Sequence, residues 1–356
     1  MSRLFMCIVG GVIALAGAAA PAWAQPAAAC DRACLRTMLD QYLAAVVKHD
    51  PAAAPLVVGF RQTENAVNTR PGNGVWKSVT GLGKVQRKYF DPVSGQAAYY
   101  GTVQEGSETA IVTIRVRVEN RRLTEAEWFI ARANDPGLNG PRRQGGPPAN
   151  LHNPDYLAQN PPPDRVVPRN QRSDRDTLIR IVDSYFDAIT SHDGSVALTH
   201  QGCGRVENGS PAPAGAFLPP GPPRGGGPAA QPGGRQNAPP AAPGAPAGQA
   251  QPGPASNDCV GGLQNFNLSM VVARRVPLVD EEAQVVLAYA VFIRRPGSPT
   301  PRNAFSEWFV IEDAKIKTIY TAMFYPPAEL AVPNWPPYDG NWPLPAGTVP
   351  SPPQPK

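Results

Sequence analysis

The stretch LRTMLDQYLAAVVKHD (residues 35–50) recurs 143 residues later as LIRIVDSYFDAITSHD (residues 178–193). In both stretches the large apolar residues recur every three or four positions, a spacing that predicts an amphipathic helix. An internal repeat on this scale indicates that one chain holds two related structural units. We therefore interpret the sequence as two copies of one domain.

The two copies stay aligned well beyond this helix. The further matches are Glu64-Asn65 with Glu207-Asn208 at the same offset, and residues 116–123 with residues 309–316 at an offset of 193. The extra residues of the second copy fall in segment 209–257, which is rich in Pro and Gly and has almost no large apolar residues. Because such a segment cannot bury enough apolar surface to fold, we expect a disordered insertion there.

Each copy is expected to continue from its first helix into a short second helix and then into strands. Asp50 before Pro51 is typical of an N-cap with proline at the first helical position, which predicts a helix over residues 51–58; Asp193 stands at the same place in the second copy. Runs rich in β-branched and aromatic residues predict strands. These runs are residues 97–103, 110–118, 123–131, 285–294, 305–311 and 316–324. The predicted fold class is α+β, with helices packed on a curved antiparallel sheet in each domain.

Composition divides the chain into further segments. Residues 1–24 hold a basic residue, an apolar run and Ala at positions 22 and 24, which is the pattern of a cleavable signal peptide, so we expect a secreted or periplasmic protein. An uncleaved membrane anchor is the alternative, and no later run is apolar enough over a sufficient length to span a bilayer. The remaining segments are domain 1 (30–134), a Pro-rich linker (135–172), domain 2 (173–325) and a Pro-rich tail (326–356).

Four cysteines follow the predicted signal peptide: Cys30, Cys34, Cys203 and Cys259. An even number in an exported chain predicts disulfides. Three connectivities are open, and the simplest joins the cysteines within each copy. The histidines do not stand at zinc-ligand spacing from these cysteines, so neither a metal nor another cofactor is predicted.

Charge and motifs restrict the function only broadly. The formal net charge is +5, and the basic residues are dispersed rather than clustered, which does not favour nucleic-acid binding. The sequence also has no recognisable catalytic triad motif and no phosphate-binding glycine loop. The sequence alone therefore assigns no enzyme class.

The predicted order of elements resembles the NTF2-like superfamily, which includes SnoaL-like cyclases and ketosteroid isomerases. The carrying residues are Tyr42-Leu-Ala-Ala-Val-Val-Lys-His-Asp50 and Tyr185-Phe-Asp-Ala-Ile-Thr-Ser-His-Asp193. The first copy is also similar to the DUF8021 domain of secreted proteins. That similarity is carried by Thr63-Glu64-Asn65, Gly74-Val75-Trp76, Phe90-Asp91-Pro92, Gly95-Gln96 and Leu123-Thr-Glu-Ala-Glu127, and it covers residues 30–134 well and 174–325 more weakly. The resemblance implies a cone-shaped domain with a pocket between sheet and helices.

The resemblance also implies roles for two residues of the first copy. In the isomerase branch a first-helix tyrosine donates a hydrogen bond to a developing oxyanion, and a later carboxylate moves the proton. Tyr42 occupies the first place, and Glu64 stands near the second. Asn65 and Trp76 are further pocket candidates. The structural alternatives are a core tyrosine, a core tryptophan and a turn asparagine that satisfies backbone groups.

Charged residues on two neighbouring predicted strands form another candidate group. A suitable register would place Arg117 opposite Glu125 and Arg115 opposite Glu127, which predicts a solvated cross-strand charge ladder. If their face were the concave one, Arg115, Arg117 and Glu127 would instead line the pocket and bind an anion. The second copy has no such charges at these positions, so the predicted site belongs to domain 1.

Three functions follow as hypotheses. The leading one is an exported protein that binds a small organic ligand in the domain 1 pocket, with the second copy serving structure, domain pairing or homodimerisation. The second is an isomerase, cyclase or dehydratase in which Tyr42 is the acid and Glu64 the base. The third is an envelope or extracellular interaction protein that acts through its Pro-rich segments.

Overall fold

The computed structural model of the chain describes residues 30–138, 140, 150–212, 259–298, 300 and 302–326. The predicted signal peptide (1–24) lies outside these residues, as do most of the predicted insertion (209–257) and nearly all of the predicted tail (326–356). No helix among the described residues is long and apolar enough to cross a membrane.

The first copy is one long helix packed on a six-stranded sheet. Helix α1 (Arg32–Val47) begins at Asp31, whose carboxylate accepts a hydrogen bond from the Cys34 backbone N–H, and it buries the predicted apolar stripe. Asp50 caps the 3-10 turn η1 (Pro51–Ala53), which is shorter than the predicted helix because the chain enters a strand at Leu56. The remaining elements are β1 (Leu56–Glu64), β2 (Val67–Asn68), α2 (Val75–Ser78), β3 (Gly81–Asp91), β4 (Gln96–Glu105), β5 (Glu108–Glu119) and β6 (Arg122–Ala131).

The second copy repeats this architecture from helix α4 (Arg175–Ser191), which Asp174 caps. Its other elements are η3 (Gly194–Val196), β7 (Thr199–Glu207), β8 (Ser210–Pro211), η4 (Leu263–Asn265), β9 (Met270–Asp280), β10 (Val285–Ile293), β11 (Arg302–Glu312) and β12 (Lys315–Phe324). The sheet orders are β2-β1-β6-β5-β4-β3 and β8-β7-β12-β11-β10-β9, which are the same topology. The internal repeat and the α+β class are therefore confirmed.

Both sheets are mixed, so the prediction of purely antiparallel sheets was wrong. Strand β1 pairs in parallel with β6, and β7 pairs in parallel with β12. The first strand of each copy crosses over to lie beside the last one. A period-two pattern shows which face of a strand is buried, but it carries no information about the direction of its neighbour.

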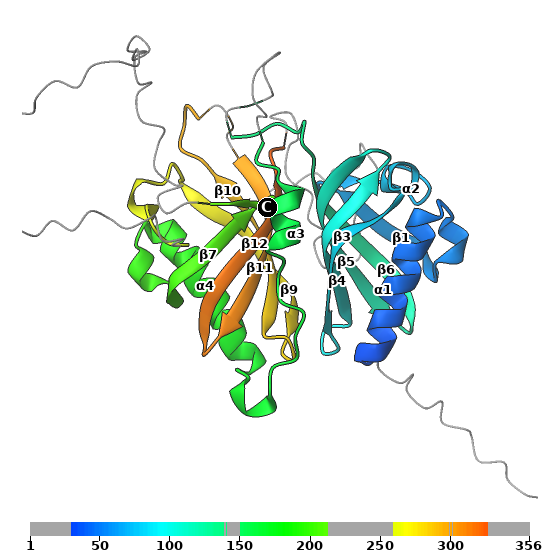
Figure 1. Ribbon diagram of the computed structural model, residues 1–356, viewed down its shortest axis with the longest axis horizontal. Helices are drawn as coiled ribbons and strands as arrows, with labels where there is room; N and C mark the ends of the chain where they lie inside the picture. The colour runs from blue at the N-terminus through cyan, green and yellow to red at the C-terminus, as the bar shows by residue number, and fades with distance from the viewer. Residues whose placement is uncertain are drawn as a thin grey trace, which may run out of the picture.

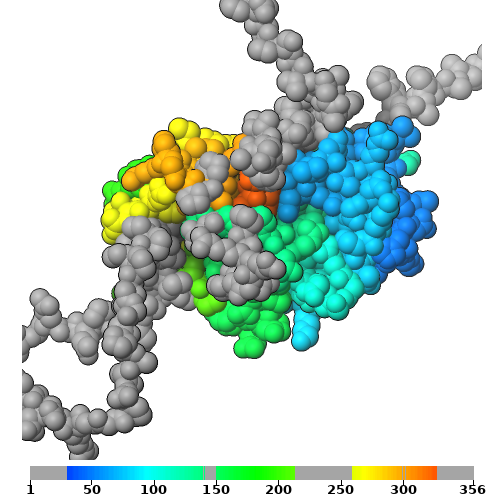
Figure 2. Space-filling view, turned by 90° about the horizontal axis from the view of Figure 1, so that it is seen from above, coloured from blue at the N-terminus to red at the C-terminus, as the bar shows by residue number. Residues whose placement is uncertain are grey.

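The two sheets pack against each other, and α1 and α4 lie on their outer sides (Figure 1). Seen from above, the two copies are in direct contact (Figure 2). In the shared core, Phe129 stacks on Tyr289 with ring centroids 4.8 Å apart. Thr113 Oγ1 accepts hydrogen bonds from Ser306 Oγ and Trp308 Nε1, each at 2.8 Å. The strand faces of the second copy that lack charged residues therefore form part of the interface between the two copies.

A reciprocal pair of aspartates joins the copies at one end of this interface. Asp91 Oδ2 accepts from the Val279 backbone N–H at 3.0 Å, and Arg175 lies 2.8 Å away. Asp280 Oδ2 accepts from the Phe90 backbone N–H at 2.9 Å, and its Oδ1 meets Arg32 Nη1 at 2.7 Å. Arg32 and Arg175 are the first residues of α1 and α4. Each copy thus supplies one arginine and one aspartate to the other.

The described part of the predicted linker follows the two sheets closely. It contains α3 (Pro154–Gln159) and the 3-10 turn η2 (Arg169–Gln171). Tyr89 of the first copy donates to the Pro163 carbonyl at 2.9 Å, and Tyr320 of the second copy donates to the Pro161 carbonyl at 3.3 Å. The segment is therefore a strap that contacts both sheets.

The structure contains two disulfides, Cys30–Cys34 and Cys203–Cys259. This is the simplest of the three predicted connectivities. Disulfides persist in oxidising compartments, which is compatible with the predicted export of the chain.

Candidate functional site inside the second copy

The interior of the first copy is filled by aromatic side chains around Tyr42. Its hydroxyl accepts a hydrogen bond from Trp128 Nε1 and donates one to Gln62 Oε1, both at 2.8 Å. Trp76 Nε1 donates to the same Gln62 oxygen at 2.9 Å. Tyr42, Trp76 and Trp128 are at most 1% exposed. The phenol and both indoles therefore have hydrogen-bond partners within the core. For Tyr42 and Trp76 this is the core role that the sequence analysis gave as the alternative to a role in a pocket.

Glu64 holds the start of helix α2. Its carboxylate accepts from the Val75 backbone N–H at 3.1 and 3.2 Å and from Gln62 Nε2 at 2.9 Å. A Cβ at Gly74 would collide with this carboxylate, which explains the glycine there. Burial raises the pKa of Glu64. The amide of Gln62 bonds to both Tyr42 and Glu64, so these two side chains are linked through it.

Asn65 acts as a backbone mimic. Its Nδ2 donates to the Ile130 carbonyl at 2.9 Å, and its Oδ1 accepts from the Ile130 N–H at 2.8 Å. Asn208 makes the same two bonds to Met323, at 3.2 and 2.8 Å. Both asparagines have positive φ, of 48° and 44°. Both atoms of the Asn65 amide bond to the backbone of the neighbouring strand. Asn65 is therefore a turn residue that satisfies backbone groups, not a ligand-binding residue.

The arginine and glutamate ladder forms in the predicted register, with Arg115 opposite Glu127 and Arg117 opposite Glu125. The prediction that this ladder is solvated was wrong, because Arg115 and Glu127 are each 2% exposed. They lie on the face that meets the second copy, where Arg275 reaches Glu127 at 2.7 Å. Arg117 pairs with Glu119 at 2.8 Å. A recess of about 10 Å³ near Arg115 is too small for a ligand beyond a single water.

The matching interior position of the second copy has a different chemistry. In the first copy, Ile114, Trp128 and Glu64 are direct neighbours across β5, β6 and β1. In the second copy the corresponding row across β11, β12 and β7 is Glu307, Thr321 and Glu207. A small hydroxyl thus replaces an indole, and a carboxylate replaces an aliphatic group.

Arg205 stands where the first copy has Gln62, and it organises the second-copy row. Its Nε meets Glu207 Oε1 at 2.6 Å, and its Nη2 meets Glu307 Oε1 at 3.2 Å. Its Nη1 donates to the Tyr185 hydroxyl. Tyr185, the counterpart of Tyr42, is fully buried. One guanidinium therefore joins the phenol to two carboxylates in the interior.

Glu307 is the least satisfied member of this cluster. It is 0% exposed, and among the described residues neither of its oxygens accepts a hydrogen bond. Burial raises the pKa of Glu307 to about 7, despite the opposing effect of Arg205. The Thr321 hydroxyl is also buried and has no hydrogen-bond partner in the described part of the chain. Polar groups in such a state cost free energy unless something else satisfies them.

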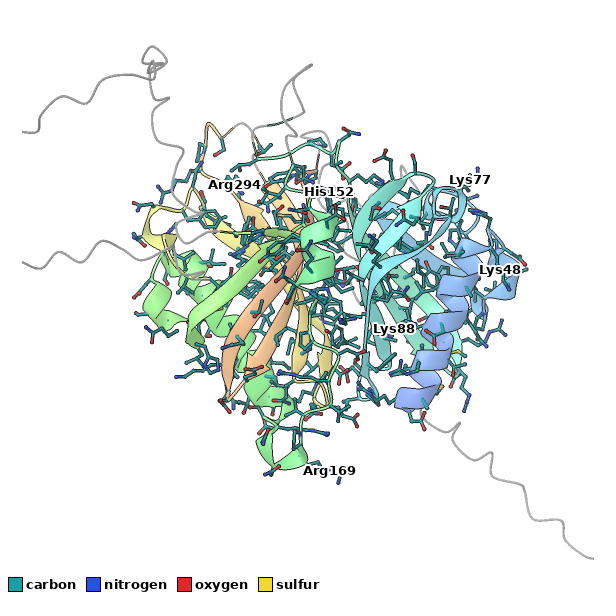
Figure 3. The ribbon with its side chains drawn as sticks, in the orientation of Figure 1. Lys48, Lys77, Lys88, His152, Arg169 and Arg294 are labelled. Atoms are coloured by element: carbon teal, nitrogen blue, oxygen red, sulfur yellow. A yellow bond between two sulfur atoms is a disulfide. The ribbon has the colours of Figure 1, made fainter. Side chains whose placement is uncertain are left out.

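A cavity of about 60 Å³ opens beside Arg205. Its lining residues are Leu138, Arg205, Glu207, Phe266, Phe292, Arg294, Asn303, Met323 and Tyr325. Arg294 Nη2 donates to Asn303 Oδ1 at 3.0 Å, and the guanidinium lies 5.6 Å from the Phe266 ring. Figure 3 labels Arg294 near the upper end of the second sheet. The wall thus combines two cations, one carboxylate and three aromatic rings, which suits a small polar molecule with an apolar part.

The disulfide Cys203–Cys259 supports this site from one side. Cys203 lies on β7, two residues before Arg205, and Cys259 leads into η4 and Phe266. His192 Nδ1 lies 2.9 Å from the Leu263 carbonyl, just as His49 Nδ1 lies 2.6 Å from that of Trp76 in the first copy. Segment η4 therefore takes the place of α2, and Leu263 stands where the first copy has Trp76. The described residues contain no cluster suited to a metal ion.

Sequence reasoning placed the site in the first copy and missed Arg205, Arg294 and Glu307. The repeat alignment did contain a signal, since an offset of 193 places Glu307 over Ile114 and Thr321 over Trp128. A carboxylate aligned with a core isoleucine indicates a changed interior. Arg294 gave no such signal, because its burial depends on the packing around Phe266.

Comparison with known families bears on the same half of the chain. The family described as a domain of unknown function (DUF8021) matches residues 171–323. This supports the predicted DUF8021 resemblance, but the match lies on the second copy, whereas the sequence analysis predicts the better coverage for the first. No curated protein and no solved structure matches the chain.

Proposed function

We propose that the chain is an exported tandem NTF2-like protein whose second copy binds a small organic molecule in its interior cavity. The observation that carries this proposal is the cavity of about 60 Å³ lined by Arg205 and Glu207, next to the row in which Thr321 replaces the Trp128 indole of the first copy. The second-copy interior is charged and has a cavity beside it, whereas the first-copy interior is packed with aromatic groups, and this contrast favours a site in the second copy. The earlier hypothesis of a domain 1 pocket is less favoured, because Tyr42, Trp76 and Gln62 saturate one another.

The experiment rebuilds the first-copy interior in the second copy. The full chain carrying Arg205→Gln, Glu307→Ile and Thr321→Trp has the residues that already pack together in the first copy. We expect this variant to fold and to lose the binding of small-molecule fragments that the wild-type chain retains, measured by ligand-observed NMR. Tyr42→Phe is the control, since it changes only the first copy. Fragment binding that survives the triple substitution but is lost in Tyr42→Phe would return the site to domain 1.

Acid–base catalysis is a second candidate function, favoured by one observation. Glu307 has a pKa of about 7, and Arg205 holds it near the Tyr185 phenol, so a proton acceptor and a hydrogen-bond donor lie in one interior. The proposed reaction class is the isomerase, cyclase or dehydratase type first considered for Tyr42 and Glu64. In D2O, the chain would accelerate deuterium exchange at the methyl carbons of acetone, and Glu307→Gln would abolish this acceleration. Equal exchange by both proteins would rule out Glu307 as the base.

The third hypothesis, an interaction protein that uses its Pro-rich segments, stays a prediction. It depends on residues 209–257 and 326–356, which lie mostly outside the described residues. Export likewise stays a proposal, and it is tested by N-terminal sequencing of the protein recovered outside the cytoplasm, with Gln25 expected as the first residue.

A further inference from the structure

Arg294 is a buried cation that forms no salt bridge among the described residues, although the nearby Glu207 acts on it electrostatically. The residue is 8% exposed, and its protein contacts are the hydrogen bond to Asn303 and the ring of Phe266. Its Nε has no hydrogen-bond partner in the described part of the chain. Burial lowers the pKa of Arg294, which reflects this incomplete compensation.

The nearby carboxylates form their salt bridges with Arg205 rather than with Arg294. Glu207 lines the same cavity, but its oxygen lies 2.6 Å from Arg205 Nε. Glu307 lies behind Arg205 and pairs with that guanidinium at 3.2 Å. A buried charge without an ion pair is costly, so an anion that enters the cavity would offset this cost. Arginine is well suited to that task, because its planar fork matches a carboxylate.

The size and lining of the cavity narrow the partner further. A volume of about 60 Å³ corresponds to roughly two water molecules, which is enough for a carboxylate group, while the rest of a ligand would lie toward the open side of the cavity. Phe266, Phe292 and Met323 supply apolar contacts on the same wall. Arg294 therefore lines a space that fits a carboxylate group and has apolar side chains beside it.

We propose that the ligand of the second copy is a small organic monocarboxylate whose anionic group binds Arg294. This inference rests on the proposed function and specifies the chemical class of its ligand. Asn303 is a positioning residue, since its Oδ1 accepts from Arg294 Nη2 and fixes the guanidinium. The apolar end of the ligand packs against Phe266 and Phe292.

The test compares propionate with propionamide, which has nearly the same shape and no charge. Binding to the full chain at pH 7 is followed by titration calorimetry and by the side-chain Nε–H NMR signal of Arg294. We expect propionate to bind at least tenfold more tightly than propionamide and to shift that signal. Arg294→Met should abolish propionate binding, whereas Arg295→Met, which removes an exposed neighbouring charge, should leave it unchanged.

Each other outcome overturns the inference in a distinguishable way. Equal binding of both probes would keep a binding cavity and reject the anionic class. Binding of neither probe, together with no fragment binding at all, would remove the site itself. Chloride that displaces propionate at equal concentration would reduce the site to an inorganic anion site. Unfolding of Arg294→Met at the temperature of the titration would assign Arg294 to the structure, since its hydrogen bond to Asn303 and its contact with Phe266 would then be its role.

Discussion

The first copy and the second copy share one topology but differ in how they fill the same interior. In the first copy Tyr42, Gln62, Trp76 and Trp128 complete one another's hydrogen bonds and leave a neutral, packed core. The second copy keeps the helix tyrosine and the strand-end glutamate, but it replaces the packing groups with charged or small ones. The comparison teaches that one topology can hold a neutral aromatic cluster in one copy and a charged cluster at the same place in the other, while a shared interface joins both copies.

The largest expected effect distinguishes Trp128 from Thr321, its counterpart in the second copy. Trp128→Ala removes a fully buried indole and should lower the free energy of unfolding by about 3–5 kcal/mol. Thr321→Val at the matching place removes a hydroxyl without a partner among the described residues, so stability should stay the same or rise. Urea denaturation of both variants measures the contrast. Equal losses would mean that Thr321 has a packing role like that of Trp128.

The reciprocal aspartates should behave as equals. Asp91→Ala and Asp280→Ala each leave an arginine and a backbone N–H of the other copy without a partner. Each variant should therefore lower the free energy of unfolding by about 3 kcal/mol. Denaturant midpoints of the two variants test this symmetry. A large loss of stability in one variant with none in the other would show that only one of the two aspartates holds the copies together.

Glu307 should make stability depend on pH. Its folded pKa of about 7 lies above the ordinary value of 4.5, so between these two pH values the folded chain holds a proton that the unfolded chain has released. Stability should therefore fall, by on the order of 2–3 kcal/mol, as pH rises from about 4.5 to 7. Glu307→Gln should flatten this dependence relative to wild type. Identical pH profiles would contradict the assigned pKa.

The smallest effect sharpens the comparison of the two tyrosines. Tyr42→Phe leaves Trp128 Nε1 and Gln62 Oε1 without the phenol, and should cost about 1–2 kcal/mol. Tyr185→Phe removes one acceptor from Arg205, which retains two carboxylates, so its cost should be about 1 kcal/mol or less. Thermal unfolding of both variants provides the check, and a larger loss for Tyr185→Phe would reverse this ranking.

The fold was predictable where local chemistry and repetition agree. The paired helices and the Asp50 cap follow from local sequence, and the disulfides have the simplest of the three connectivities that the sequence left open. The parallel strands β1 and β7 did not, because their pairing is decided by distant parts of the chain. The face on which Arg115 lies was also unpredictable, since burial there comes from the other copy.

The candidate site was less predictable than the fold for a related reason. Tyr42 and Glu64 resemble a catalytic pair in sequence, but Gln62 and two tryptophans from distant positions satisfy them. Arg294 became a candidate only through its lack of an ion pair, which is a property of three-dimensional packing.

The most direct test of the contrast between the copies is a crystal structure of the full chain grown with propionate. Electron density for the anion between Arg294 and Arg205, together with unmoved indoles of Trp76 and Trp128, is the predicted result. Density beside Tyr42 and Trp76, with the second-copy cavity closed, would contradict the account and place the site in the first copy.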